Sequence, residues 1–298
     1  MTQTLAVLTM MLTVATPLVF AGLGEVITER SGVLNLGIEG TMYLGAFVGF
    51  LASGALHSAW WGILVAMLAG AAAGALMGLL TVTVGVNQHV AGIGTTLLLV
   101  AACNFVSRLK SSGGASEQVP KLSKLFGSTA VIGQYPLTYL ALFVVAPVIW
   151  WVLRSTGMGL KLRAVGESPE AADAAGVSVP LTRYLALTVG GAFMGLGGAF
   201  LTVAMLGSFS LDIVSGRGWV CIALVIFGRW KVWPTVGGAL LFGFAEGLEK
   251  QLAITTTFAS VPNELWLALP YIVVVAALII WGRGVRYPGA YLKAYKRA

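Results

Sequence analysis

The stretch ITERSGVLNLGIEGTMYLGAF, residues 27–47, places charged and amide side chains between two apolar runs. Residues 1–24 carry no charged side chain, and the run that follows Glu39 is apolar again. An ionised side chain that faced lipid would cost about 2.5–3.5 kcal/mol on insertion scales. We therefore expect Glu39 to face protein or water within a membrane-embedded helix.

The composition of the whole chain indicates a membrane protein. Of the 298 residues, 58% are hydrophobic and 10% are charged, whereas about a quarter of a soluble domain is charged. Apolar runs of about twenty residues suit helical spans, because strands of a membrane barrel are about half as long and alternate in polarity. We predict an all-α, polytopic transmembrane helical bundle that forms one domain over residues 1–298.

The sequence contains about nine hydrophobic segments, and we expect between eight and ten spans. The segments are roughly 3–24, 32–52, 60–84, 90–107, 137–153, 183–206, 217–228, 232–249 and 264–282. The seventh is too short to cross a hydrocarbon core of about 30 Å. We expect it to be a re-entrant or broken helix that protein or a water-filled path surrounds.

Lysine and arginine side chains predict the orientation, because cytoplasmic loops carry an excess of them. The basic tail, 283–298, is predicted to be cytoplasmic. The loop at about 154–182 is predicted to lie on the same side, with Arg154, Lys161, Arg163 and the neighbouring Arg183. The count of spans places the N-terminus and residues 108–136 outside, although the latter contain Arg108, Lys110, Lys121 and Lys124.

Small residues at intervals of four predict close helix packing. Gly70, Gly74 and Gly78 share one helix face, as do the pairs Gly45 and Gly49, Gly191 and Gly195, and Gly243 and Gly247. Such stripes allow helix backbones to approach one another in lipid. The two cysteines lie within spans and the two histidines lie far apart in the sequence, so we predict neither a disulfide framework nor a metal site.

Residues 168–176, SPEAADAAG, are predicted to form a short helix in the cytoplasmic loop. Ser168 can cap it, Pro169 suits the first helical position, and Gly176 can end it in the left-handed conformation. Glu170 in the first turn is favoured by the helix dipole. A helix of about two turns is marginal in water, so it must pack either on this protein's own inner surface or in the groove of a partner.

The same segment resembles the E-A-A-x-x-x-G motif with which ABC-transporter permeases dock on their ATPase subunits, with Glu170-Ala171-Ala172 followed by Gly176. The I-x-L-P ending of type I importers is missing from it. The stretches ERSGVLNLGIEG, GVNQHVAGIGTTLLL and GRGWVCIALVIFGRWKVWPTVGGALLFGFAEGL resemble the branched-chain amino acid, simple-sugar and nucleoside permease family. The first of these stretches is most similar to the nucleoside-type branch.

This resemblance implies a fold like that of type II importers, with an internal pseudo-repeat, and a complex of several subunits. The implied partners are ATPase subunits that use ATP and magnesium, a second permease subunit, an extracytoplasmic substrate-binding protein and the lipid bilayer, without nucleic acid. It also implies that the coupling residues are Glu167, Ser168, Glu170, Ala171, Ala172 and Gly176. The sequence has no G-x-x-x-x-G-K-[ST] loop, so we expect a transport subunit with no catalytic residue and no cofactor of its own.

The candidate solute path begins with Asn35 and Glu39, whose spacing of four predicts one shared helix face. Tyr43 continues that face by one turn. We consider two interpretations of Glu39 equally: it lines the path, or it is a structural carboxylate bound to backbone donors or to an arginine from another helix.

Three further residues are path candidates. Asn87 and Gln88 begin a predicted helix, where they suit either a neutral hydrogen-bonding ligand or, more often, helix capping. Trp219 could stack against a base or a sugar. In contrast, Lys250 is expected to pair with Glu246 one helical turn earlier.

Together with these features, the resemblance implies a permease subunit that carries a small polar solute across the plasma (inner) membrane of a bacterium. The resemblance favours a nucleoside or purine-like compound, and a simple-sugar permease is the alternative within the family. A stand-alone secondary transporter or channel is the alternative of another class. It would use several intramembrane charges, and only Glu39 and Glu246 are candidates.

Overall fold

The computed structural model describes residues 3–110, 118–127, 131–253, 263–281, 286–293 and 295, and every regular element in these ranges is a helix. The α-helices are α1 (Gln3–Arg30), α2 (Ile38–Ala55), α3 (Ala59–Gly78), α4 (Gln88–Lys110), α5 (Pro136–Tyr139), α6 (Ala146–Ser155), α7 (Gly157–Glu167), α8 (Pro169–Ala174), α9 (Val179–Ala199), α10 (Arg217–Phe227), α11 (Val232–Ala253) and α12 (Asn263–Trp281). Three π-helical stretches extend or join them: η1 (Leu79–Val84), η3 (Leu140–Val145) and η4 (Phe200–Leu206).

The predicted spans all fall on these helices. Five helical stretches of the described chain are long and apolar enough to cross a membrane: Thr4–Arg30, Ala59–Val84, Gln88–Lys110, Pro136–Ser155 and Val179–Leu206. Two shorter apolar helices are Arg217–Phe227 and Leu265–Ile280. The all-helical, multi-span fold is therefore confirmed.

Two predicted boundaries were wrong. The first helix continues past residue 24 to Arg30, and the second begins at Ile38 instead of residue 32. The difference arises because Glu25 and Glu29 find hydrogen-bond partners inside the bundle, so they do not end the helix at a membrane surface. Helix α7 was also missed; the hydroxyl of Thr156 caps it by accepting a hydrogen bond from the N–H of Gly159 at 3.2 Å.

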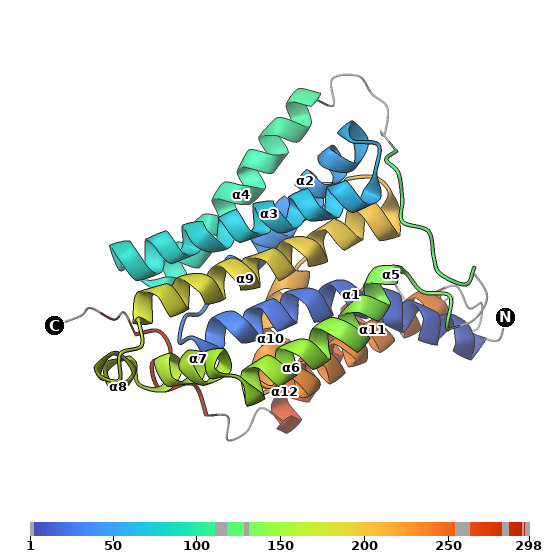
Figure 1. Ribbon diagram of the computed structural model, residues 1–298. Coiled ribbons are helices and arrows are strands. Elements are labelled where there is room, and N and C mark those ends of the chain that lie inside the picture. The colour runs from blue at the N-terminus through green and yellow to red at the C-terminus, as the bar shows by residue number, and fades with distance from the viewer. Residues whose placement is uncertain are drawn as a thin grey trace.

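The helices form one bundle with reciprocal packing. Figure 1 shows α7 and α8 at one end, the start of α1 at the other, and α1 and α9 running in opposite directions. The two most extensive helix pairs are α1 with α11 and α9 with α3. If α1–α4 and α9–α12 are taken as two halves, the first helix of each half packs on the third helix of the other, as expected for an internal repeat of inverted topology.

The glycine stripes lie where helix backbones meet. A Cβ atom at Gly74 would overlap the carbonyl oxygen of Leu187, and one at Gly191 would overlap the carbonyl oxygen of Gly70. These contacts join α3 to α9, and Gly243 similarly approaches the Met11 carbonyl on α1. The predicted close packing is confirmed.

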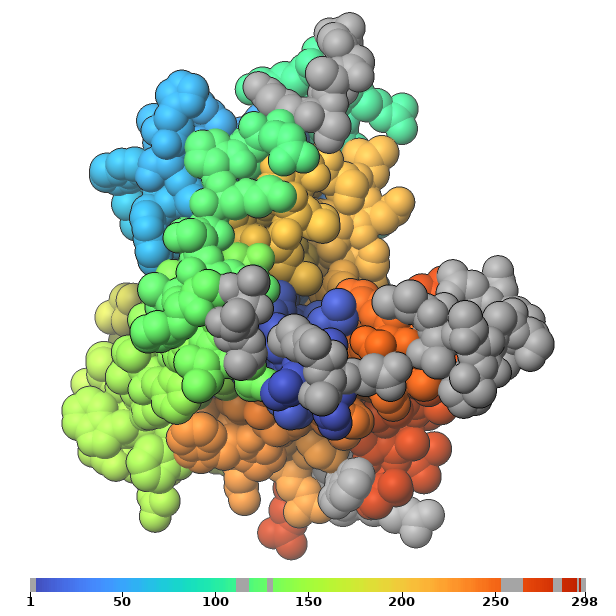
Figure 2. All heavy atoms as spheres, turned by 90° about the vertical axis from the view of Figure 1, so that its right-hand side faces the viewer, coloured from blue at the N-terminus to red at the C-terminus, as the bar shows by residue number. Residues whose placement is uncertain are grey.

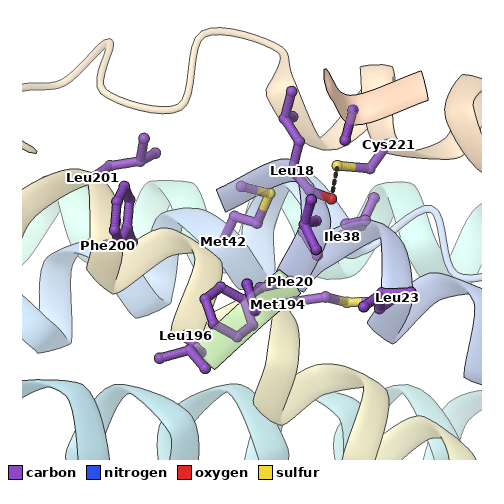
Figure 3. Close-up of a cluster of buried hydrophobic side chains, with 14 of the residues drawn as sticks. Leu18, Phe20, Leu23, Ile38, Met42, Met194, Leu196, Phe200, Leu201 and Cys221 are labelled. Carbon is purple, nitrogen blue, oxygen red and sulfur yellow. Dashed lines mark hydrogen bonds between the residues drawn. The ribbon is translucent and has the colours of Figure 1, made fainter. Parts of the chain in front are cut away.

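Helix α10 begins in the middle of the bundle. The Sγ atom of Cys221 lies 3.7 Å from the carbonyl oxygen of Leu18, halfway along α1. Figure 3 shows this contact within a buried core that also contains Met42 from α2 and Met194 from α9. The seventh segment is therefore a broken span, in which the irregular stretch 207–216 precedes α10.

The irregular stretch starts at the end of the bundle where α1 begins. Figure 2 faces this end and shows residues 118–127, in green, lying across it beside the yellow end of η4. The N–H groups of Val119 and Leu122 donate to the carbonyls of Gly207 and Val203, both at 3.0 Å. Residues 118–127 thus lie at the end opposite α8, as expected for loops predicted on different sides of the membrane.

Candidate functional site

Glu39 lies in the first turn of α2 and caps α10. Its Oε1 and Oε2 atoms accept hydrogen bonds from the N–H groups of Gly216 at 2.8 Å and Gly218 at 2.7 Å. A carboxylate at a helix N-terminus satisfies free donors and matches the helix dipole. This geometry supports the interpretation of Glu39 as a structural carboxylate bound to backbone donors.

Asn35 does not share a helix face with Glu39, so this part of the predicted stripe was wrong. It lies in the loop before α2, where its Oδ1 accepts from the N–H of Gly37 at 3.0 Å. Its own N–H donates to Oε1 of Glu25 at 3.2 Å. Asparagine side chains that bond to nearby backbone compete with helix formation, which explains why α2 begins only at Ile38.

Tyr43 does follow Glu39 by one turn of α2. Its hydroxyl donates to Oδ1 of Asn104 on α4, and its ring meets Phe209 edge-on at 5.4 Å between centroids. Tyr43 is 4% exposed. In this chain it therefore joins α2 to α4 and to the irregular stretch 207–216.

Asn87 and Gln88 face different partners at the start of α4. The Oδ1 atom of Asn87 accepts from the N–H of His89 at 2.9 Å, which caps α4. The buried Gln88 accepts from the N–H of Leu34 at 2.8 Å. The Gln88 bond fixes the loop before α2, and neither of the two bonds involves another path candidate.

Trp219 and the irregular stretch form a polar and aromatic face beside the Glu39 cap. Trp219 is 43% exposed in the second position after the start of α10. Asp212 and Ser215 are exposed just before the helix, and the carbonyl of Ser215 accepts from the hydroxyl of Tyr271 at 3.0 Å. Irregular backbone at membrane depth is tolerated only where protein or a water-filled path surrounds it.

An ion-pair group next to this face was only partly predicted. Lys250 pairs with Glu246 at 2.8 Å as expected, and Arg217 also reaches the same Oε1 atom of Glu246 at 2.9 Å. The pairing of Arg217 with Glu246 was not predicted, because Glu246 lies on α11, far from Arg217 in the sequence. The spacing of Glu246 and Lys250 alone could not indicate a third member.

Three buried ionisable side chains at the α7 end were also missed. Glu25 and Glu29 are fully buried on α1, and Glu29 accepts a hydrogen bond from Nε1 of Trp230. Arg183 is 2% exposed, which corrects its assignment to a hydrophilic loop. It belongs to α9, and its guanidinium donates to the carbonyls of Ser31 and Lys293, both at 3.3 Å.

Helix α8 has one buried face and one exposed face. Ser168 caps it, with its hydroxyl accepting from the N–H of Ala171 at 3.4 Å, and Gly176 follows with a φ of 81°. Pro169 and Ala172 are buried against this chain, whereas Glu170 and Ala171 are exposed. The predicted short helix is confirmed, and it both packs on this protein and presents a surface.

Glu167, the first of the predicted coupling residues, belongs to α7 and not to α8. It ends α7, and its Oε2 accepts from the N–H of Gly289 at 3.2 Å, so it contacts the C-terminal segment. No group of three His, Cys, Asp or Glu residues that could hold a metal ion is present in the described part of the chain.

The apolar helices enclose a broken span, and polar side chains are exposed where α10 begins inside the bundle. These features are typical of a helical membrane transport protein. The chain belongs to the family described as branched-chain amino acid transport system / permease component, which matches residues 7–278. It is therefore a permease subunit of an ABC transporter, in agreement with the expected family.

Three relatives illustrate the range within the family. The chain is 33% identical to the guanosine ABC transporter permease NupQ of Bacillus subtilis, over 89% of this chain and 88% of the relative. It is 32% identical to the nucleoside ABC transporter permease NupC of Lactococcus lactis, over 91% and 90%. It is 35% identical to TsgC13 of Haloferax volcanii, provisionally named a glucose ABC transporter permease, over 95% of each. No solved structure matches the chain.

Proposed function

We propose that this permease subunit carries a nucleoside or purine-like compound inward across the plasma membrane of a bacterium. The observation that carries the proposal is the face made by Asp212, Ser215 and Trp219 where α10 begins. Its hydroxyl and carboxylate groups can hydrogen-bond a polar solute, and an exposed indole can stack on a base. Exposed polar backbone at this depth needs water or a second subunit beside it.

The path would lie between this face and a second permease subunit, identical or related. In that arrangement Glu39 acts through α10: it holds Gly216 and Gly218 and so sets the position of Trp219. Tyr43 would support the same face from behind through Phe209. Asn35 and Gln88 then hold the loop before α2 and Asn87 caps α4, away from the solute.

Transport would be powered by separate ATPase subunits that bind ATP and magnesium, since this chain has no phosphate-binding loop of the usual pattern. The exposed face of α8, with Glu170 and Ala171, is the proposed docking surface. Its buried face, with Ala172, would transmit movement of the ATPase to α7 and α9. An extracytoplasmic binding protein would deliver the solute at the opposite end.

The proposed orientation places the α8 end in the cytoplasm. Arg30, Arg154, Arg163, Arg229 and Arg286 lie on elements that meet at this end, in keeping with the positive-inside rule. Three other basic residues of the tail, Arg283, Lys296 and Arg297, lie outside the described residues.

The test is uptake of labelled guanosine and labelled glucose by cells that express the complete transporter and lack other uptake systems. We expect guanosine uptake that unlabelled nucleosides compete away. Uptake of glucose but not guanosine would instead favour the sugar alternative, which the similarity to TsgC13 supports. Solute flux through the purified chain alone in liposomes, without ATP, would contradict both and favour a stand-alone transporter.

A further inference from the structure

A cationic cavity lies at the α8 end of the bundle, away from the proposed solute path. It has a volume of about 390 Å³, within the range of small-ligand sites. Four guanidinium groups and one carboxylate line it, from Arg30, Arg163, Arg229, Arg286 and Glu167. The carboxylate already accepts a backbone hydrogen bond from Gly289. The lining therefore has an excess of positive formal charge, which favours the binding of an anion.

The walls of this cavity are joined to one another by hydrogen bonds and by a close backbone contact. Nε of Arg30 donates to the carbonyl of Trp230 at 2.8 Å, which joins the end of α1 to the turn before α11. The N–H of Ala290 donates to the carbonyl of Gly166 at 2.8 Å, which joins the C-terminal segment to α7. A Cβ atom at Gly166 would overlap the carbonyl oxygen of Arg30. The arginines are therefore carried on a preorganised frame.

An aromatic cluster borders the same cavity. The ring of Trp230 lies 5.0 Å from that of Tyr287 and 6.0 Å from that of Tyr291, between centroids. Of these three residues, Trp230 lines the cavity itself. Aromatic side chains beside arginines are typical of the membrane–water interface, where lipid headgroups lie.

We propose that this cavity binds a phosphate group, supplied by an anionic phospholipid of the cytoplasmic leaflet. Arginine suits this ligand because its planar group can donate two parallel hydrogen bonds to phosphate oxygens. The cavity joins α1, α7 and the C-terminal segment, and α8 follows α7 directly. A bound headgroup would therefore stabilise the frame from which α8 projects.

The experiment measures the thermal midpoint of the purified full-length chain in detergent with three additions at equal ionic strength: phosphatidylglycerol, phosphatidylcholine and inorganic phosphate. We expect phosphatidylglycerol at saturation to raise the midpoint by roughly 5 °C and phosphatidylcholine to leave it unchanged. The double variant Arg163→Gln/Arg286→Gln should lose this shift. Lys231→Gln removes one positive charge from the neighbouring turn without touching the cavity, and it should keep the shift.

The same measurement separates the two sources of phosphate. An equal shift with inorganic phosphate, lost in the double variant, would support the site with a soluble ligand. No shift with either ligand, or an undiminished shift in the double variant, would overturn the proposal. If the double variant does not fold, the exposed Arg286→Gln alone gives the same comparison, with a reduced shift expected.

Discussion

Glu39 on α2 accepts a hydrogen bond from the backbone N–H of Gly218 on α10 at a distance of 2.7 Å. Glu39 lies in the first turn of α2 and Gly218 in the first turn of α10. One carboxylate thus serves as the cap of a helix far away in sequence. The position of α10, and with it the exposed Trp219, depends on this contact.

Replacing Glu39 tests the capping role. Glu39→Ala leaves the N–H groups of Gly216 and Gly218 without their acceptor, so we expect a loss of about 1.5–3 kcal/mol in stability. Glu39→Gln keeps one acceptor oxygen and should lose less. Thermal unfolding of the purified chain measures both. An unchanged midpoint for Glu39→Ala together with abolished uptake would show instead that the carboxylate acts on the solute.

Two glycine substitutions separate helix packing from helix propensity. Gly74→Ala places a methyl group against the Leu187 carbonyl on α9, and we expect a loss of about 1–3 kcal/mol from overpacking. Gly94→Ala is the matched control, because a Cβ atom there meets nothing within 4 Å. It should be neutral or stabilising by up to about 1 kcal/mol. Equal effects of the two variants on the thermal midpoint would contradict the packing at α3 and α9.

Neighbouring alanines of α8 should respond differently to the same change. Ala171→Arg alters the exposed face, so we expect an unchanged thermal midpoint and a loss of at least tenfold in ATPase affinity, about 1.4 kcal/mol. Ala172 is 4% exposed, and Ala172→Arg should lower the midpoint. Co-purification of the ATPase gives the second readout. Full ATPase binding by Ala171→Arg would count against α8 as the docking surface.

A double-mutant cycle can measure the interaction energy between Glu246 and Arg217. Glu246→Gln leaves the half-buried Arg217 without its carboxylate, and we expect a loss approaching 3 kcal/mol. Adding Arg217→Gln should cost less than the sum of the two single changes, since neither charge is then left alone. Lys250→Gln, on a more exposed side chain, should cost below about 1 kcal/mol. Strict additivity of the first two changes would refute their coupling.

Local signals in the sequence were sufficient for several elements. Apolar runs of suitable length predict the spans, because lipid requires every backbone group to be bonded within a helix. The stripe through Gly70 and Gly74 predicts a close approach, and the pattern from Ser168 to Gly176 predicts a capped helix. Each depends on residues within a turn or two of one another.

The pairing of distant residues could not be predicted in this way. The sequence suggested that Asn35 and Glu39 share a helix. In the structure, Asn35 lies in the loop before α2 and Glu39 caps α10. Folding also buried Glu25, Glu29 and Arg183 among partners contributed by distant segments. The residue types and their periodicity thus determined a membrane-embedded helical bundle, and the resemblance of its motifs to a known family indicated a permease. The tertiary structure decided which polar group meets which, because a polar group buried among apolar helices is costly unless it is hydrogen-bonded, and partners such as Gly218 for Glu39 lie far away in the sequence.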